Sequence, residues 1–213
     1  IPFQKRANRS TFAGGSSNNT LSAANGLLVP NTFSVSQDDD AAMCSLDFIF
    51  NSTDGTTNPV TINASQSLSA QSFTALFGLG PIVVNGTTLT EALGFTVNTG
   101  IQTITERHNG GLYPTKIYIV SRRPFFEISF ADIDDAQALL SSVHTVMTGA
   151  TCYMRKRSGV GYVADVTAQH CKFTFTDGLI TTDGIQASGT GSGTCSVRLY
   201  GEGLTVSAAT AIT

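Results

Sequence analysis

The chain has 213 residues, of which 13% are charged, with a formal net charge of −3 from 12 basic and 15 acidic side chains. Hydrophobic residues make up 41% of it, which is enough for a core and excludes an intrinsically disordered chain. The small negative charge gives no general attraction to nucleic acid or to an anionic membrane, and no uncharged stretch approaches the roughly 20 apolar residues of a spanning helix.

Residues 1–30 are predicted to form an extended N-terminal arm. Lys5, Arg6 and Arg9 lie in it without any acidic residue, and a run rich in Gly, Ser and Asn follows them. The arm is either a disordered terminus or a segment that becomes ordered against a neighbouring subunit. Because the chain begins at Ile1 rather than Met, we expect a trimmed or processed start.

Residues 31–213 are predicted to form a single β-sandwich domain. Cys44, Leu46, Phe48 and Phe50 recur at every second position, the period of a strand with one core face. Further strands are expected at 60–63, 95–105, 116–121 and 125–130. Short helical turns are expected at 70–77 and 89–93, the second of them from capping-box spacing.

The strongest helix signal covers residues 133 to about 147. Asp132 is the expected N-cap, and Asp134 and Asp135 in the first turn suit the positive end of the helix dipole. Apolar residues recur at helical spacing and are expected to pack on a sheet. They are Ile133, Ala136, Leu140, Val143 and Met147.

The C-terminal third is typical of an antiparallel meander. Strands are expected at 151–156, 162–166, 169–176 and 195–200, with a hairpin signal at Asp177-Gly178. The predicted fold class is therefore mainly β. We expect an antiparallel β-sandwich or barrel with one flanking α-helix at about 133–147 and one or two short helical turns.

No motif indicates catalysis or a cofactor. His108, His144 and His170 are scattered, and structural roles are favoured for them. The glycine-rich segment 189–193 has β pattern on both sides, so a hairpin tip is a better interpretation than a phosphate loop. We therefore expect neither an enzyme nor a bound cofactor.

The acidic and thiol side chains do not show metal-ligand spacing, so no metal site is expected. Cys44, Cys152, Cys171 and Cys195 lack the close pairs of a zinc site. Buried free thiols are favoured for them, while disulfides stay open, since Cys152 and Cys171 flank a predicted hairpin. The run 38–40, which is Asp-Asp-Asp, has no calcium-loop pattern and is interpreted as a solvated loop.

Two basic groups occur close to turns. Arg155, Lys156 and Arg157 approach the tip of a predicted hairpin, and Arg122 and Arg123 precede Pro124. Such charges either keep an exposed tip soluble, which is the favoured interpretation, or form a patch that binds an acidic surface or phosphate.

The order of elements from Lys116 to Tyr200 resembles that of the tail tube proteins of long-tailed bacteriophages and related injection machines. The similarity lies in the segments KIYIVSRRPFFEISF, ADIDDAQALLSSV, ATCYMRKRSGVGYVADV, HCKFTFTDGLITTDG and SGTCSVRLYG. It implies a non-enzymatic virion protein, assembled in the host cytoplasm, whose copies form rings, commonly hexameric, that stack into a tube.

The resemblance also implies partners and contacts. The partners would be further copies of the chain and other virion proteins, with DNA only in transit through a lumen and no membrane. The arm with Lys5, Arg6 and Arg9 and the 151–166 hairpin with its basic tip at 155–157 would be assembly contacts. That basic tip departs from the family pattern, because a lumen that carries DNA is expected to be acidic or neutral.

Two alternatives remain open. A capsid, decoration or other virion β-sandwich protein would have the same low charge and hydroxyl-rich strands. A secreted, extracellular carbohydrate-binding or adhesin module shares the composition, although such a module uses exposed aromatic side chains and this chain has no Trp.

Overall fold

The structure is a computed structural model that describes residues 2–3, 15–38, 41–68, 76–131, 139, 144–186 and 194–213. The chain forms two compact units: unit 1 comprises Ile1–Val29, Asp47–Thr74 and Gln102–Val120, and unit 2 comprises Pro30–Leu46, Ala75–Ile101 and Ser121–Thr213. This division differs from the predicted boundary at residue 30, because two later segments group with the N-terminal one.

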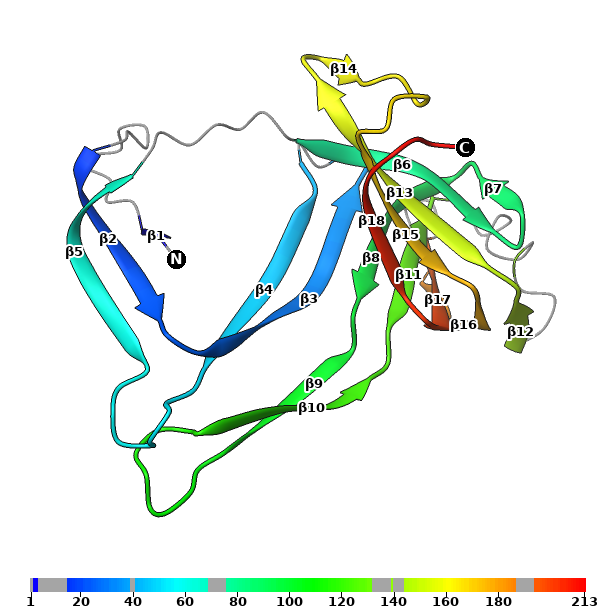
Figure 1. Cartoon of the computed structure of the whole chain (residues 1–213). Coiled ribbons are helices and arrows are strands. Elements are labelled where there is room, and N and C mark those ends of the chain that lie inside the picture. The colour runs from blue at the N-terminus through cyan, green and yellow to red at the C-terminus, as the bar shows by residue number, and fades with distance from the viewer. Residues whose placement is uncertain are drawn as a thin grey trace. The chain divides into compact units, whose positions relative to one another are not determined.

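The first sheet of unit 2 has the strand order β12-β16-β17-β11-β8-β3-β4 (Figure 1). Neighbouring strands from β12 to β3 pair antiparallel. The strands are β12 (His144–Met147), β16 (Asp177–Gln186), β17 (Thr194–Glu202), β11 (Phe125–Phe130), β8 (Ala92–Asn98), β3 (Gly26–Ser36) and β4 (Met43–Phe50). Strands β3 and β4 continue into unit 1.

The second sheet of unit 2 has the order β18-β15-β13-β6-β7, again with antiparallel pairs. A short strand, β14 (Gly161–Tyr162), pairs with the end of β13 and forms the tip of a hairpin. The strands are β18 (Thr205–Thr210), β15 (His170–Phe175), β13 (Ala150–Ser158), β6 (Phe77–Val84) and β7 (Thr87–Leu89).

The core of unit 2 lies between these two sheets. Phe126 of β11 stacks on Phe175 of β15 with ring centroids 4.1 Å apart, and Phe33 of β3 lies 5.2 Å from Phe173 of β15. The expected alternation in β11 is confirmed, because Phe126, Ile128 and Phe130 are all buried. The mainly β, sandwich-like architecture with antiparallel sheets is therefore confirmed.

Unit 1 consists of thin sheets. Strands β1 (Pro2–Phe3), β2 (Gly15–Ala23) and β5 (Val60–Leu68) form one antiparallel sheet, and β9 (Ile101–Glu106) pairs with β10 (Lys116–Arg122) in another. Strand β2 therefore occupies part of the predicted arm. Among the described residues, every member of the main hydrophobic core belongs to unit 2.

The predicted flanking helix at 133–147 is not borne out. Residues 132–138 and 140–143 lie outside the described residues, and Leu139 between them is buried in the core of unit 2. The last four residues are wrong as helix, because His144–Met147 form strand β12, which pairs with β16. Their β-branched Thr145 and Val146 suit a strand, and the ladder of backbone hydrogen bonds outweighs the helical spacing.

Neither of the two predicted helical turns is found among the described residues. Residues 70–75 lie outside the described residues, and Phe77 already begins strand β6. The turn at 89–93 is wrong: Leu89 ends β7 and Ala92 begins β8. Asn85 and Gly86 have φ angles of 51° and 79°, the conformation of a two-residue hairpin turn. This turn holds β7 against β6 and leaves no helical backbone there.

Candidate functional site

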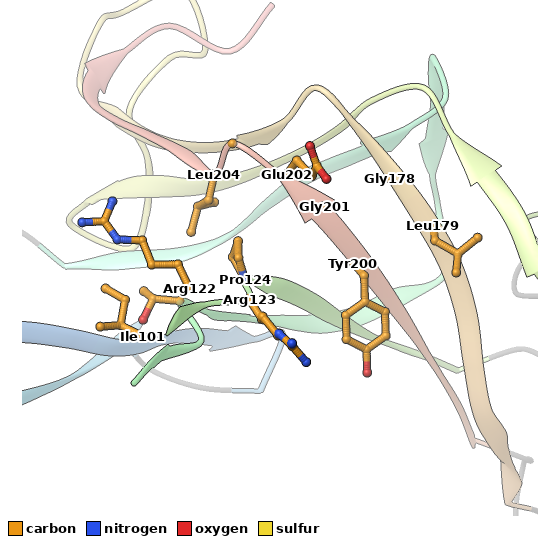
Figure 2. A pocket seen from close by; sticks show the side chains of 12 residues that line it. Ile101, Arg122, Arg123, Pro124, Gly178, Leu179, Tyr200, Gly201, Glu202 and Leu204 are labelled. Carbon is orange, nitrogen blue, oxygen red and sulfur yellow. The ribbon is translucent and has the colours of Figure 1, made fainter. Parts of the chain in front are cut away.

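An open cleft of about 810 Å³ lies on unit 2, where β10 passes into β11 beside the hairpin of β16 and β17 (Figure 2). We call it the arginine cleft. Its volume falls in the range of sites that bind a small molecule or a short peptide segment. It is lined by Thr99, Ile101, Arg122, Arg123, Pro124, Gly178, Leu179, Tyr200, Gly201, Glu202, Gly203 and Leu204.

The turn between β8 and β9 fixes the backbone under the two arginines. The predicted single strand at 95–105 is broken here, because Gly100 has a φ of 58°. Gly100 accepts a hydrogen bond from the N–H of Arg123 at 3.2 Å, and a side chain at position 100 would collide with the Arg123 backbone. Buried Thr99 anchors the turn by donating its hydroxyl to the carbonyl of Pro30 at 2.6 Å. Glycine is therefore required at position 100.

The floor of the cleft is bare backbone. Gly178 of β16 lies opposite Gly201 of β17, so neither strand places a side chain there. A Cβ atom on Gly201 would come within 2.6 Å of the ring of Phe175, which belongs to the buried core. Beside this floor, Leu179 and Tyr200 are about 38% and 39% exposed and supply an apolar wall.

The charge of the cleft is positive. Arg122 and Arg123 are exposed, and Glu202 is the single acidic residue among the lining residues. Within the described part of the chain, neither arginine forms an ion pair with a carboxylate. Figure 2 shows Glu202 on the opposite side of the cleft from Arg123. The cleft therefore presents two guanidinium groups with free donors to an anionic group.

The basic residues at the tip of the β13–β14 hairpin form a second cluster, which we call the tip cluster. Arg155 donates its Nε to the Asp165 carboxylate at 3.0 Å and lies over the ring of Tyr162, 5.1 Å from its centroid. Lys156 donates its Nζ to Gln169 at 2.9 Å, and the guanidinium of Arg157 lies 5.9 Å from the Tyr162 centroid. These cations therefore stabilise the tip itself.

His170 stabilises the same hairpin through two hydrogen bonds. It is fully buried, and its Nδ1 accepts the backbone N–H of Lys156 at 3.1 Å. Because Nδ1 is an acceptor, the proton of the neutral ring is on Nε2, which lies 3.2 Å from the carbonyl oxygen of Ala164 and donates to it. His170 thus has the structural role predicted for it, since it ties the two sides of the tip together.

The four cysteines are free thiols. Cys152 lies opposite Phe173 and Cys171 opposite Met154, so the two thiols of this hairpin do not face one another. Burial raises the pKa of the Cys152 thiol well above its ordinary value. The core position expected for Cys44 is wrong, because Cys44 is exposed.

Strand β4 is an exposed edge strand. It lies at the end of its sheet, and all residues from Met43 to Phe48 are exposed. Leu46 and Phe48 are each 42% exposed, although their alternation predicted a core face. The sequence contains no signal for this outcome, because period two reports that a strand has an apolar face and not what covers it.

The structure brings together only some of the residues that were predicted to make assembly contacts. Arg155, Lys156 and Arg157 meet in the tip cluster, whereas Lys5, Arg6 and Arg9 lie outside the described residues. Their role in assembly stays a prediction. The sequence by itself identified Arg122 and Arg123 as a basic pair. The structure adds the glycine floor and the apolar wall beside them, which are created by the pairing of β16 with β17.

Across the described ranges, no group of three or more His, Cys, Asp or Glu side chains is arranged to hold a metal ion. The same residues include no helix with the length and apolar character that crossing a membrane requires. Comparison with known protein families finds no match. A comparison with curated proteins also finds no match.

Proposed function

We propose that this chain is a non-enzymatic structural protein that assembles with further copies of itself, and that its assembly is the tube of a phage tail or related injection machine. The observation that carries the assembly is the construction of unit 1. Its strands are paired, yet among the described residues it contributes nothing to the main core cluster, and its one buried apolar side chain is Val29. Two-stranded and three-stranded sheets without a covered apolar face are marginally stable in water.

Apolar side chains on these thin sheets support the same proposal. Ile62 of β5 is 71% exposed, and Ile104, Tyr118 and Val120 of the β9–β10 pair are 40% to 52% exposed. Soluble monomers rarely expose so many large apolar groups on neighbouring strands, because burying them is favourable. Neighbouring copies that cover these strands would supply the missing burial.

The exposed edge of β4 is the second support. An edge strand with unpaired backbone groups and apolar side chains invites pairing with another chain, and monomeric proteins usually block such edges with charges or bulges. Strand β4 carries one charged residue, Asp47, within an otherwise uncharged strand. The tube, rather than another form of assembly, rests on the resemblance of residues 116–200 to tail tube proteins.

The test is the mass and shape of the protein in solution. Negative-stain electron microscopy and light scattering over a range of concentrations are expected to show hollow rings or tubes. Closed shells would favour a capsid protein instead. A monomer at every concentration would overturn self-assembly and would make a glycan-binding screen the next step.

A pair of variants connects the result to β4. The double variant Leu46→Glu with Phe48→Glu places two charges on one face of the strand and is expected to reduce assembly. Ser45→Glu is the matched control on the other face of the same strand. Circular dichroism of both proteins should match the wild type, because the changed side chains are exposed. Unchanged assembly of the double variant would exclude this face of β4 from the interface.

A further inference from the structure

The sequence contains three Asn-Gly dipeptides, at positions 25, 85 and 109. In such a dipeptide the side-chain amide of asparagine is open to attack by the next backbone nitrogen, because glycine has no side chain to obstruct it. All three asparagines are exposed. We propose that Asn109 is a site of spontaneous deamidation, and that the fold protects Asn25 and Asn85 from the same reaction.

The reaction needs no partner other than water. The backbone nitrogen of Gly110 gives its proton to water and attacks Cγ of Asn109. A five-membered succinimide ring forms, and the bond from Cγ to Nδ2 breaks as the amide nitrogen takes up a proton and leaves as ammonia. Water then opens the ring. Cleavage of the new bond gives aspartate at position 109, whereas cleavage at the backbone carbonyl carbon gives isoaspartate.

Asn85 is a natural control for Asn109, because the two share a backbone conformation. Asn85 and Gly86 have φ angles of 51° and 79°, and Asn109 and Gly110 have φ angles of 54° and 70°. Both pairs therefore occupy the centre of a turn in which both central residues have positive φ. Since the dipeptide, the exposure and the turn are alike, the contacts of the side chain decide how the two sites differ.

The Asn85 side chain is held by three hydrogen bonds. Its Nδ2 donates to the carbonyl of Val146 at 3.3 Å, and its Oδ1 accepts the backbone N–H of Thr148 at 2.7 Å and the Thr148 hydroxyl at 3.1 Å. The Asn109 side chain makes no hydrogen bond to any residue that the structure describes. Only the Asn85 amide must therefore leave its partners before it can react.

Asn25 is protected through its backbone instead. Attack requires the peptide group between asparagine and glycine to turn toward the side chain. The carbonyl of Asn25 accepts the N–H of Asn51 at 3.3 Å, and a Cβ atom on Gly26 would lie 2.6 Å from the carbonyl oxygen of Ile49. This peptide group is therefore bonded and closely packed against β4.

The peptide group between Asn109 and Gly110 lacks both restraints. It forms no backbone hydrogen bond within the described part of the chain, and a Cβ atom on Gly110 would meet nothing within 4 Å. The turn lies in the loop that joins β9 to β10 (Figure 1) and is closed by the N–H of Gly111, which donates to the carbonyl of His108 at 2.9 Å. Isoaspartate adds one carbon atom to the backbone inside this turn, so the modification alters the end of the β9–β10 hairpin.

Peptide mass spectrometry of the aged protein tests the assignment. The whole chain is incubated in neutral buffer at a concentration below assembly and is sampled over weeks. Trypsin releases residues 108–116 as one peptide, and chymotrypsin separates Asn25 from Asn85. Deamidation at Asn109 is expected to be at least about tenfold faster than at Asn85, since opening three hydrogen bonds of ordinary strength lowers the reactive population by at least that factor.

A synthetic peptide of residues 108–116 in the same buffer gives the rate without the fold. If this peptide reacts to completion while Asn109 of the protein stays intact, the proposal is wrong. It is also wrong if Asn25 or Asn85 reacts before Asn109. Because the chemistry needs no second copy of the chain, neither result bears on self-assembly.

The products identify the route of the reaction. Water opens the succinimide at either carbonyl, so the modified peptide should appear as two species of equal mass, aspartate and isoaspartate, that separate by reversed-phase chromatography. Direct hydrolysis of the side-chain amide would give aspartate alone and would contradict attack by the Gly110 nitrogen.

The variant Thr148→Val tests why Asn85 is protected. It removes the hydroxyl that donates to Asn85 and leaves the backbone N–H of residue 148 in place. Deamidation of Asn85 is expected to become a few-fold faster, the effect of one hydrogen bond, while Asn109 in the same chain keeps its rate as the internal control. An unchanged rate at Asn85 would contradict protection by these hydrogen bonds.

Discussion

Replacing Phe126 by Ala is expected to be one of the most damaging single changes in unit 2. Phe126 is fully buried on β11 and stacks on Phe175 of the opposite sheet, at 4.1 Å between centroids and an interplanar angle of 25°. Truncation of a buried Phe costs about 3–5 kcal/mol, and the stacked geometry places this case in the upper part of that range. We expect a loss of about 4 kcal/mol in the free energy of unfolding.

The assay is urea unfolding followed by far-ultraviolet circular dichroism at a concentration below assembly. The matched control is Val146→Ala on β12 of the same sheet, because Val146 is 70% exposed. That change is expected to cost less than about 1 kcal/mol. If Phe126→Ala destabilised the protein no more than Val146→Ala, the two sheets would not share the core described above.

Three further changes test the cleft, the hairpin and the unit 1 loop. Gly201→Ala places a methyl group against the ring of Phe175 and is expected to lower the free energy of unfolding in urea by about 1–3 kcal/mol. An unchanged urea midpoint would mean that the backbone at the floor of the cleft can move away from Phe175. His170→Leu leaves the N–H of Lys156 and the carbonyl of Ala164 without their partner, so we expect a loss of about 2–5 kcal/mol, and equal stability would contradict the bridging role. The Asp54 carboxylate accepts hydrogen bonds from Thr57 first and from other groups of its loop, which hold its pKa well below the ordinary value of about 3.9. Because the pKa of Asp54 is lower in the folded chain than in the unfolded chain, the ionised carboxylate stabilises the fold above about pH 4, and this stabilisation is lost as the pH falls further. The difference in the free energy of unfolding between the wild type and Asp54→Ala should therefore shrink below about pH 4. A difference that stays constant with pH would refute the assignment.

The edge strand β4 shows what a sequence pattern can predict and what it cannot. Leu46 and Phe48 alternate with polar residues as Phe126 and Ile128 do, and both patterns correctly predict strands. Yet Phe126 is buried while Phe48 is 42% exposed. The period of a strand identifies which side chains share a face, whereas the burial of that face depends on which other segment lies against it.

Local rules also failed where pairing competed with them. The capping-box spacing of Thr88 and Glu91 is a real helix signal, but the hairpin turn at Asn85-Gly86 places the segment in the β6–β7 ladder instead. His144–Met147 likewise follow a helical stripe and form a strand. In both cases the competing interaction comes from a partner strand, which a local pattern cannot include.

Composition and periodicity by themselves determined that the chain is mainly β with antiparallel hairpins, because alternation and turn residues act over a few positions. They also identified Arg122, Arg123 and the acidic run 38–40 as separate charged groups. Only the tertiary structure decided that Arg122 and Arg123 line one cleft with the common floor of Gly178 and Gly201, and that the described residues of unit 1 add nothing to the main core cluster. The physical reason is that strand order and register are set by contacts between segments far apart in the sequence, so no local pattern contains them.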